Sequence, residues 1–198
     1  KKLFGRDGNK KEGQLKMTSS YDMSRKFKSI NIAILTVSDT RTSITDKSGT
    51  FFCNAIVDAG HRVIDKLIVK DEITDIKNVL ESWSMSSEID VIISTGGTGL
   101  TKRDVSVEAH SQVYEKEITA FSSMFATISM AKIGTSALQS RACAGVRNGT
   151  YLFALPGSPS ACRDAWENLL KPQFDYRHLP CNFVEIMPRL VKDPVDES

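Results

Sequence analysis

A glycine-rich loop follows a short apolar run near the middle of this 198-residue chain. The apolar run is Asp90-Val91-Ile92-Ile93, and after Ser94 the loop continues as Thr95-Gly96-Gly97-Thr98-Gly99 toward Lys102-Arg103-Asp104. Glycine permits a positive φ and lets a ligand come close to peptide N–H groups, and threonine adds hydroxyl donors. A buried strand that ends in such a loop is typical of an α/β protein that binds a phosphorylated ligand at the end of the strand.

The glycines alone fit two interpretations, because a tight turn from strand to helix also requires them. The spacing matches neither the GxGxxG fingerprint of dinucleotide-binding proteins nor the GxxxxGK[ST] motif of a P-loop. We predict that the Ser106 side chain caps a helix that begins at Val107. This would place the positive end of that helix beside the loop and favour an anion there.

Strand and helix patterns alternate along the first half of the chain. Ile30–Val37 and Arg62–Lys70 are predicted strands, and the spacing of apolar residues predicts an amphipathic helix over Ile73–Trp83. Another helix should follow Asp46-Lys47-Ser48-Gly49 and end at Gly60. This order predicts an α/β fold with three layers, a mostly parallel sheet with helices on both faces, and a ligand site at the carboxyl ends of the strands.

The second half of the chain should complete this sheet. Helical segments are expected around residues 107–115 and 117–130, the second with a core stripe of Ile118, Phe121, Phe125 and Ile128. Tyr151–Leu155 is predicted to be a last buried strand. It ends at Pro156-Gly157-Ser158-Pro159, where Ser158 suits a helix N-cap and Pro159 the first helical position. We expect these two strand-to-helix corners to converge on one cleft.

Charge is distributed unevenly and suggests how the chain is divided. Residues 1–28 contain nine Lys/Arg against three Asp/Glu, whereas the remainder contains seventeen against twenty-one. We expect a flexible basic arm over 1–28, one α/β domain over 29–185 and a C-terminal tail over 186–198 that lies on the surface. A mildly acidic domain argues against nucleic acid as the main partner.

The lengths of the apolar runs and the arrangement of the cysteines indicate where in the cell the protein is expected. No apolar run reaches the ~18 residues that span a bilayer, and the first 20 residues lack the apolar segment of a secretory signal. The four cysteines are scattered without a CxxC pair or histidines at zinc spacing. We therefore expect a cytoplasmic protein with no membrane partner, whose cysteines are buried thiols.

Several motifs occur together between about Ile30 and Phe183. They are Ser38-Asp39-Thr40-Arg41, Asp46-Lys47-Ser48-Gly49, Thr95-Gly96-Gly97-Thr98-Gly99 with Arg103-Asp104-Val105, Ile133-Gly134-Thr135-Ser136, Gln139-Ser140-Arg141, Leu155-Pro156-Gly157-Ser158-Pro159, Ala161–Glu167 and Pro180-Cys181-Asn182-Phe183. In this combination the chain resembles the MoaB/Mog family of molybdenum cofactor biosynthesis, and within it the MoaB branch.

The resemblance implies a molybdopterin-binding domain that forms a homo-oligomer, a trimer or a hexamer. Active members of the family transfer AMP from Mg-ATP to the terminal phosphate of molybdopterin. By resemblance, Asp104 and Asp71 are the catalytic carboxylates and would bind Mg²⁺. The substrate-binding residues implied in the same way are Ser38, Asp46, Ser48, Gly49, Thr95, Gly96, Gly97, Thr98, Gly99, Gly157, Ser158 and Pro159.

Other interpretations stay open at this point. Asp104 also suits a charge at a helix N-terminus, with no role in catalysis. The sequence departs from the family pattern at Ser106-Val107, where Thr-Pro is usual, and at Lys70, where the AMP-transferring branch commonly has proline. The protein is therefore either a molybdopterin adenylyltransferase or an oligomeric protein that binds molybdopterin without catalysis. A dinucleotide oxidoreductase would follow from the fold alone, but the required glycine spacing is absent.

Overall fold

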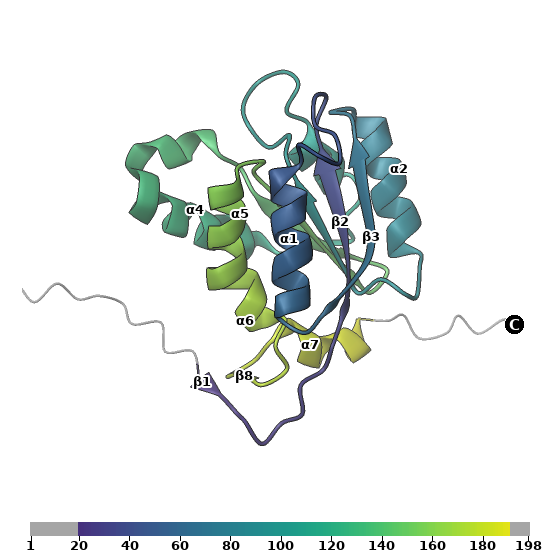
Figure 1. The fold of residues 1–198 in the computed structure, drawn as a ribbon, viewed down its shortest axis with the longest axis vertical. Helices are drawn as coiled ribbons and strands as arrows, with labels where there is room; N and C mark the ends of the chain where they lie inside the picture. The colour runs from purple at the N-terminus through teal and green to yellow at the C-terminus, as the bar shows by residue number, and fades with distance from the viewer. Residues whose placement is uncertain (1–19, 191–198) are drawn as a thin grey trace, which may run out of the picture.

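The computed structural model describes residues 20–190, which form a three-layer αβα fold (Figure 1). The central sheet has six strands in the order β3-β2-β4-β7-β6-β5. Its strands are β2 (Asn31–Val37), β3 (Arg62–Val69), β4 (Val91–Thr95), β5 (Lys116–Glu117), β6 (Cys143–Arg147) and β7 (Thr150–Leu155). The helical elements are α1 (Lys47–Asp58), α2 (Ile73–Ser84), α3 (Ser106–Ser111), α4 (Thr119–Ile133), η1 (Gly134–Gln139), α5 (Pro159–Ala165), η2 (Trp166–Leu170), α6 (Lys171–Gln173), α7 (Phe183–Ile186) and η3 (Met187–Arg189).

Two apolar clusters fill the space on either side of the sheet. Side chains alternate along β2, so that Ile32 and Ile34 face the cluster under α1, α4 and α5, whereas Leu35 faces the cluster under α2 and α3. The predicted stripe on α4 belongs to the first cluster: Phe121 and Phe125 are buried, and its two isoleucines are partly buried against them. The predicted α/β class and its helix-covered sheet are therefore confirmed.

The sheet is parallel over four strands and antiparallel at one edge. β2 pairs in parallel with β3 and β4, and β4 pairs in parallel with β7. β6 runs antiparallel to both β7 and β5. The sequence analysis did not predict β5 or β6, because β5 has only two residues and β6 contains the small residues Ala144 and Gly145.

Caps are predicted at Ser158 and Ser106; α1 has a further cap, Asp46, and begins at Lys47 rather than after Gly49. Asp46 caps α1 by accepting a hydrogen bond from the Gly49 N–H at 2.9 Å, and Ser158 caps α5, with Pro159 in the first turn. The prediction for Ser106 was wrong. The helix begins at Ser106 itself, and its hydroxyl donates to the Gly96 carbonyl at 2.7 Å. A buried carbonyl in the glycine loop needs a donor, and Ser106 supplies it.

The structure describes residues 20–28 of the expected arm over 1–28. Ser20–Tyr21 (β1) pairs antiparallel with His178–Leu179 (β8), and the Lys28 ammonium lies 3.7 Å from the centre of the Tyr176 ring. Residues 1–19 of the expected arm lie outside the described part of the chain. Of the expected tail over 186–198, Ile186 ends α7 and Met187–Arg189 form η3, while residues 191–198 are likewise outside it.

The described residues also bear on the membrane and cysteine predictions. Between residues 20 and 190, no helix has the length and apolar character needed to cross a bilayer. All four cysteines are free thiols. Cys143 and Cys162 are buried, but Cys53 is half-buried and Cys181 is exposed, so the prediction of buried thiols holds for only two of them.

A buried polar network connects α3 to the sheet. His110 is fully buried, with Nε2 2.9 Å from the Ser94 hydroxyl and Nδ1 3.0 Å from the Tyr114 hydroxyl. Tyr114 in turn donates to the Cys143 sulfur at 3.3 Å. Because burial disfavours the charged imidazolium, the pKa of His110 is lowered to about 3.

We expect His110 to make the fold less stable at mildly acidic pH. In the unfolded chain it binds a proton near pH 6.5, whereas in the native protein it stays neutral until about pH 3. Stability is therefore lost as pH falls below about 6.5, by about 2 kcal/mol at pH 5. Urea unfolding at pH 7 and pH 5 should show a smaller loss in His110→Gln, which cannot take up this proton. An equal loss in both proteins would contradict the assignment.

Candidate active site

An open pocket of about 670 Å³ lies at the carboxyl ends of β2, β4 and β7. All of the substrate-binding and carboxylate residues predicted from the sequence line it except Gly49 and Ser158. The two expected strand-to-helix corners meet there, since the Gly96 N–H donates to the Leu155 carbonyl at 2.9 Å. The Ser48 hydroxyl ties α1 to the second corner by donating to the Gly157 carbonyl at 2.8 Å.

The glycine loop forms one wall of the pocket and requires its glycines. Gly96 and Gly97 have φ values of +105° and +63°. A Cβ on Gly96 would lie 2.1 Å from the Val37 carbonyl oxygen, which is part of the neighbouring strand. The N–H groups of Gly97 and Thr98 have no hydrogen-bond acceptor within residues 20–190. They are therefore available to a ligand, as an anion-binding loop requires.

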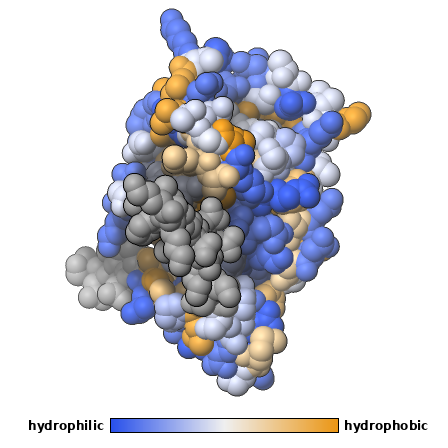
Figure 2. All heavy atoms as spheres, turned by 90° about the vertical axis from the view of Figure 1, so that its left-hand side faces the viewer, coloured by the Kyte–Doolittle hydropathy of each residue, from blue (hydrophilic) through white to orange (hydrophobic). Residues whose placement is uncertain are grey.

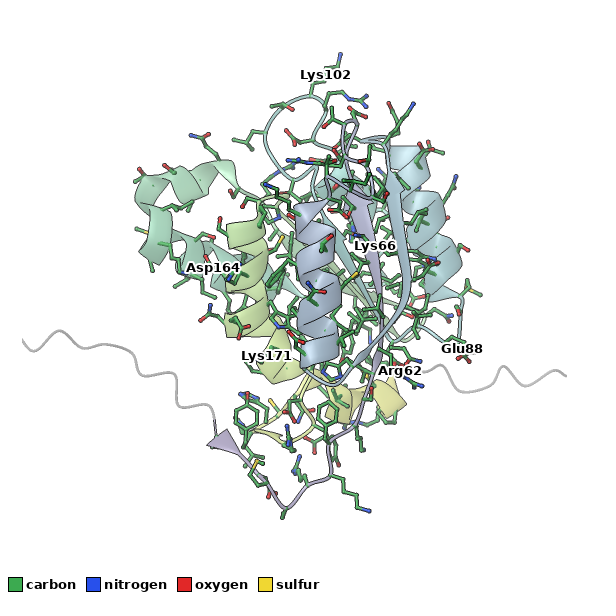
Figure 3. The ribbon with its side chains drawn as sticks, in the orientation of Figure 1. Arg62, Lys66, Glu88, Lys102, Asp164 and Lys171 are labelled. Atoms are coloured by element: carbon green, nitrogen blue, oxygen red, sulfur yellow. The ribbon has the colours of Figure 1, made fainter. Side chains whose placement is uncertain are left out.

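The N-terminus of α1 forms a second wall, and Asp46 holds it in place. This carboxylate is buried and accepts hydrogen bonds from the Thr36 hydroxyl and the Gly49 N–H, both at 2.9 Å. It also forms an ion pair with Lys66 at 3.0 Å, and Figure 3 shows Lys66 between α1 and the sheet. A Cβ on Gly49 would lie 2.1 Å from the Asp46 carboxylate, so Gly49 supports the wall without lining it.

Asp71 enters the pocket from the end of β3. Its carboxylate accepts the Asp39 N–H at 3.1 Å, while the Asp71 N–H donates to the Asp39 carboxylate at 3.3 Å. Burial, with the nearby Asp39 charge as the second cause, raises the pKa of Asp71. Its Oδ1 lies 2.6 Å from where a Cβ on Gly97 would stand. With Lys70 before it, Asp71 thus still reaches the glycine loop.

Asp104 lies beside the last glycine of the same loop, with its Oδ2 2.8 Å from where a Cβ on Gly99 would stand. The Thr101 hydroxyl and N–H donate to one of its carboxylate oxygens at 2.6 and 2.8 Å. These bonds, the hydroxyl first among them, lower the pKa of Asp104, which is therefore ionised at neutral pH. Val105, and not Asp104, is the N-cap of α3.

The two carboxylates suit a hard cation that is only partly coordinated by protein. Across residues 20–190, no three His, Cys, Asp or Glu side chains are grouped closely enough to hold a metal ion. Mg²⁺ does not need such a cage, since it commonly binds one or two carboxylates and completes its shell with water and phosphate oxygens. Asp71, after β3, and Asp104, after the glycine loop, line the same pocket and fit that requirement.

Sequence reasoning missed several residues of the pocket. Arg41 and Lys47 add two cations, and Gln139 and Ser140 line the side nearest η1. Arg41 was visible in the polar segment after β2. Nothing in the local sequence places Gln139 or Ser140 in the pocket, because tertiary packing brings η1 there. Lys102, by contrast, points outward from the loop (Figure 3).

Comparison with known proteins places this pocket in a family. Residues 33–176, which include every pocket residue, match the family model described as "Probable molybdopterin binding domain". The chain belongs to this family. Within the family, molybdenum cofactor biosynthesis protein B of Escherichia coli (strain K12) is 46% identical over 161 residues, which cover 81% of this chain and 95% of that relative.

Solved structures of family members support the same assignment. A crystal structure of molybdenum cofactor biosynthesis protein B has a TM-score of 0.76 at 37% identity, covering 84% of this chain and 98% of its own. The tungsten cofactor synthesizing protein MoaB from Pyrococcus furiosus has a TM-score of 0.63 at 29% identity, covering 71% and 89%. The resemblance to the MoaB/Mog family and its MoaB branch is therefore confirmed.

Proposed function

We propose that this protein acts in molybdenum cofactor biosynthesis by binding molybdopterin and transferring AMP from ATP to its terminal phosphate. The observation that carries the proposal is the pocket itself, which is lined both by the loop with its unpartnered N–H groups and by two carboxylates, Asp71 and Asp104. Membership of the molybdopterin-binding family and the name of the Escherichia coli relative support the choice of substrate.

Several features of the pocket would contribute to the binding of phosphate. The N–H groups of Gly97 and Thr98 would bind phosphate, with Arg41 and Lys47 as the neighbouring cations. The N-terminus of α1 adds a positive dipole end on the same side. The Ser48 hydroxyl holds α1 against the second corner at Gly157 and so helps to fix the width of the cleft.

The proposed reaction joins two phosphates. An oxygen of the terminal phosphate of molybdopterin attacks the α-phosphorus of ATP, and pyrophosphate leaves. Such transfer needs alignment and charge neutralisation more than it needs a protein nucleophile. Mg²⁺ held by Asp71 and Asp104 would neutralise phosphate charge. The loop would hold the attacking phosphate, and the two carboxylates would orient the nucleotide against it.

Molybdopterin binding without catalysis is the second candidate function. The raised pKa of Asp71 favours it, because burial and Asp39 disfavour the charged form of the carboxylate that a cation needs. Two experiments distinguish the candidates. Calorimetric titration with molybdopterin should show binding in either case, and addition of Mg-ATP should then release pyrophosphate only if the protein is the enzyme. Absence of molybdopterin binding would contradict both functions.

We also propose that the protein is a homo-oligomer, a trimer or a hexamer. Large apolar side chains are exposed on α4 and η1: Met124 by 47%, Met130 by 64%, Ile133 by 54% and Leu138 by 80%. Figure 2 views the molecule from the α4 side, where hydrophobic side chains are scattered among hydrophilic ones. Light scattering at micromolar concentration should give a multiple of the 21.9 kDa chain mass. The mass of a single chain would refute the oligomer.

A further inference from the structure

Arg141 reaches the glycine loop from a distant part of the chain. It lies between η1 and β6, and its Nε donates to the carbonyls of Thr98 and Gly99, both at 3.0 Å. Its Nη2 donates to the Asp104 carbonyl at 3.2 Å. The guanidinium is held in turn by an ion pair with the Glu108 carboxylate on α3. One side chain therefore bonds three carbonyls of the segment that carries Asp104.

These bonds determine which way the N–H groups of Gly99 and Leu100 point. In a trans peptide the C=O and the next N–H point in opposite directions. Anchoring the Thr98 carbonyl on Arg141 turns the Gly99 N–H away from Arg141, and that N–H is among the groups that hydrogen-bond to the Asp104 carboxylate. Anchoring the Gly99 carbonyl orients the Leu100 N–H in the same way.

The chemistry of arginine suits this position better than that of lysine. A guanidinium offers five donors in a rigid plane, so it can bond several carbonyls and a carboxylate at once. An ammonium has three donors on a flexible stem and acts as a point charge. The other bonds that hold Asp104, from Thr101, arise within the loop and do not fix the loop against the rest of the fold.

We propose that Arg141 is a positioning residue of the pocket, which acts through the backbone of Thr98, Gly99 and Asp104 to keep the phosphate-binding loop and the Asp104 carboxylate in place. The role in turnover rests on the proposed function, whereas the role in ordering the loop does not. Arg141 itself does not line the pocket.

The test compares Arg141→Gln and Arg141→Lys with the matched control Glu108→Gln. Glu108→Gln removes the ion pair but leaves all three bonds from Arg141 to carbonyls. Hydrogen exchange of the bonded amides of Gly99, Thr101 and Asp104 should accelerate about tenfold or more in Arg141→Gln. It should accelerate less in Arg141→Lys and least in the control. If Arg141→Gln does not fold, Arg141→Lys carries the test.

A second measurement separates positioning from general stability. In Arg141→Gln, kcat should fall about tenfold or more at a temperature at which the variant stays folded, because the carboxylate is misplaced, whereas kcat should change much less in Glu108→Gln. Unchanged exchange of the loop amides overturns the proposal, as does faster exchange with unchanged kcat. If the wild-type protein releases no pyrophosphate, the proposed function fails instead. The dissociation constant of molybdopterin then replaces kcat, and an unchanged constant in Arg141→Gln overturns the proposal.

Discussion

Replacing Asp104 with alanine should lower turnover by about 10²–10³-fold, the loss that follows deletion of one preorganised charge-stabilising group. In the structure this carboxylate is ionised, is held by Thr101 and faces the same pocket as Asp71. Its removal leaves the developing phosphate charge less neutralised in the transition state. Molybdopterin binding should change far less, because the loop N–H groups remain. The test measures the turnover number and the affinity for molybdopterin on the same preparation of the variant.

Two control variants distinguish the role of the Asp104 charge from the role of its hydrogen bonds with Thr101. Asp104→Asn keeps an oxygen for Thr101 but loses the charge, and it should lose turnover almost as fully as the alanine variant. Thr101→Ala removes the hydroxyl donor but keeps the carboxylate, and it should retain most of the activity. If Asp104 served only the dipole of α3, its loss would cost about 0.3–1 kcal/mol of stability and leave turnover per folded molecule unchanged. Normal turnover in Asp104→Ala would contradict the metal assignment.

Replacing Gly97 with valine should weaken molybdopterin binding about tenfold to a hundredfold, the effect of losing one hydrogen bond to a charged phosphate, about 1.5–3 kcal/mol. Gly97 has a φ of +63°, which a β-branched residue rarely adopts. Its Cβ would also lie 2.6 Å from both the Asp71 Oδ1 and the Ser106 hydroxyl. The substitution therefore disturbs the phosphate-binding N–H groups and displaces one carboxylate. Calorimetric titration with molybdopterin measures the effect.

Gly134 provides a matched control for this substitution. It has a similar φ of +58°, but nothing lies within 4 Å of the Cβ that valine would add, and it does not line the pocket. Gly134→Val should therefore strain the backbone but leave the affinity for molybdopterin unchanged. Equal affinities in Gly97→Val and the wild-type protein would refute the anion-binding role of the loop.

The sequence allowed prediction of the elements whose signals are local. Alternating apolar and β-branched runs located β2, β3, β4 and β7, and the residues at their ends located both corners of the pocket. Ser158 was recognisable as a cap because a cap acts within three residues of itself.

The remaining features depend on contacts between distant residues. Ser106 follows the rule for a cap in sequence, but the buried Gly96 carbonyl takes its hydroxyl instead. Gln139 lines the pocket and Arg141 bonds the carbonyls of the glycine loop, and no short-range pattern carries that information. Asp71 was predicted by resemblance, whereas its pairing with Asp39 required the structure.

The central claim is that the pocket between Asp71 and Asp104 transfers AMP to molybdopterin. The most direct test incubates the purified protein with molybdopterin and Mg-ATP and measures pyrophosphate and the adenylylated pterin together. We expect equal amounts of the two products, with no release when Mg²⁺ is chelated and greatly reduced release in Asp104→Ala. Tight molybdopterin binding with neither product would contradict the claim and identify the protein as a non-catalytic binder.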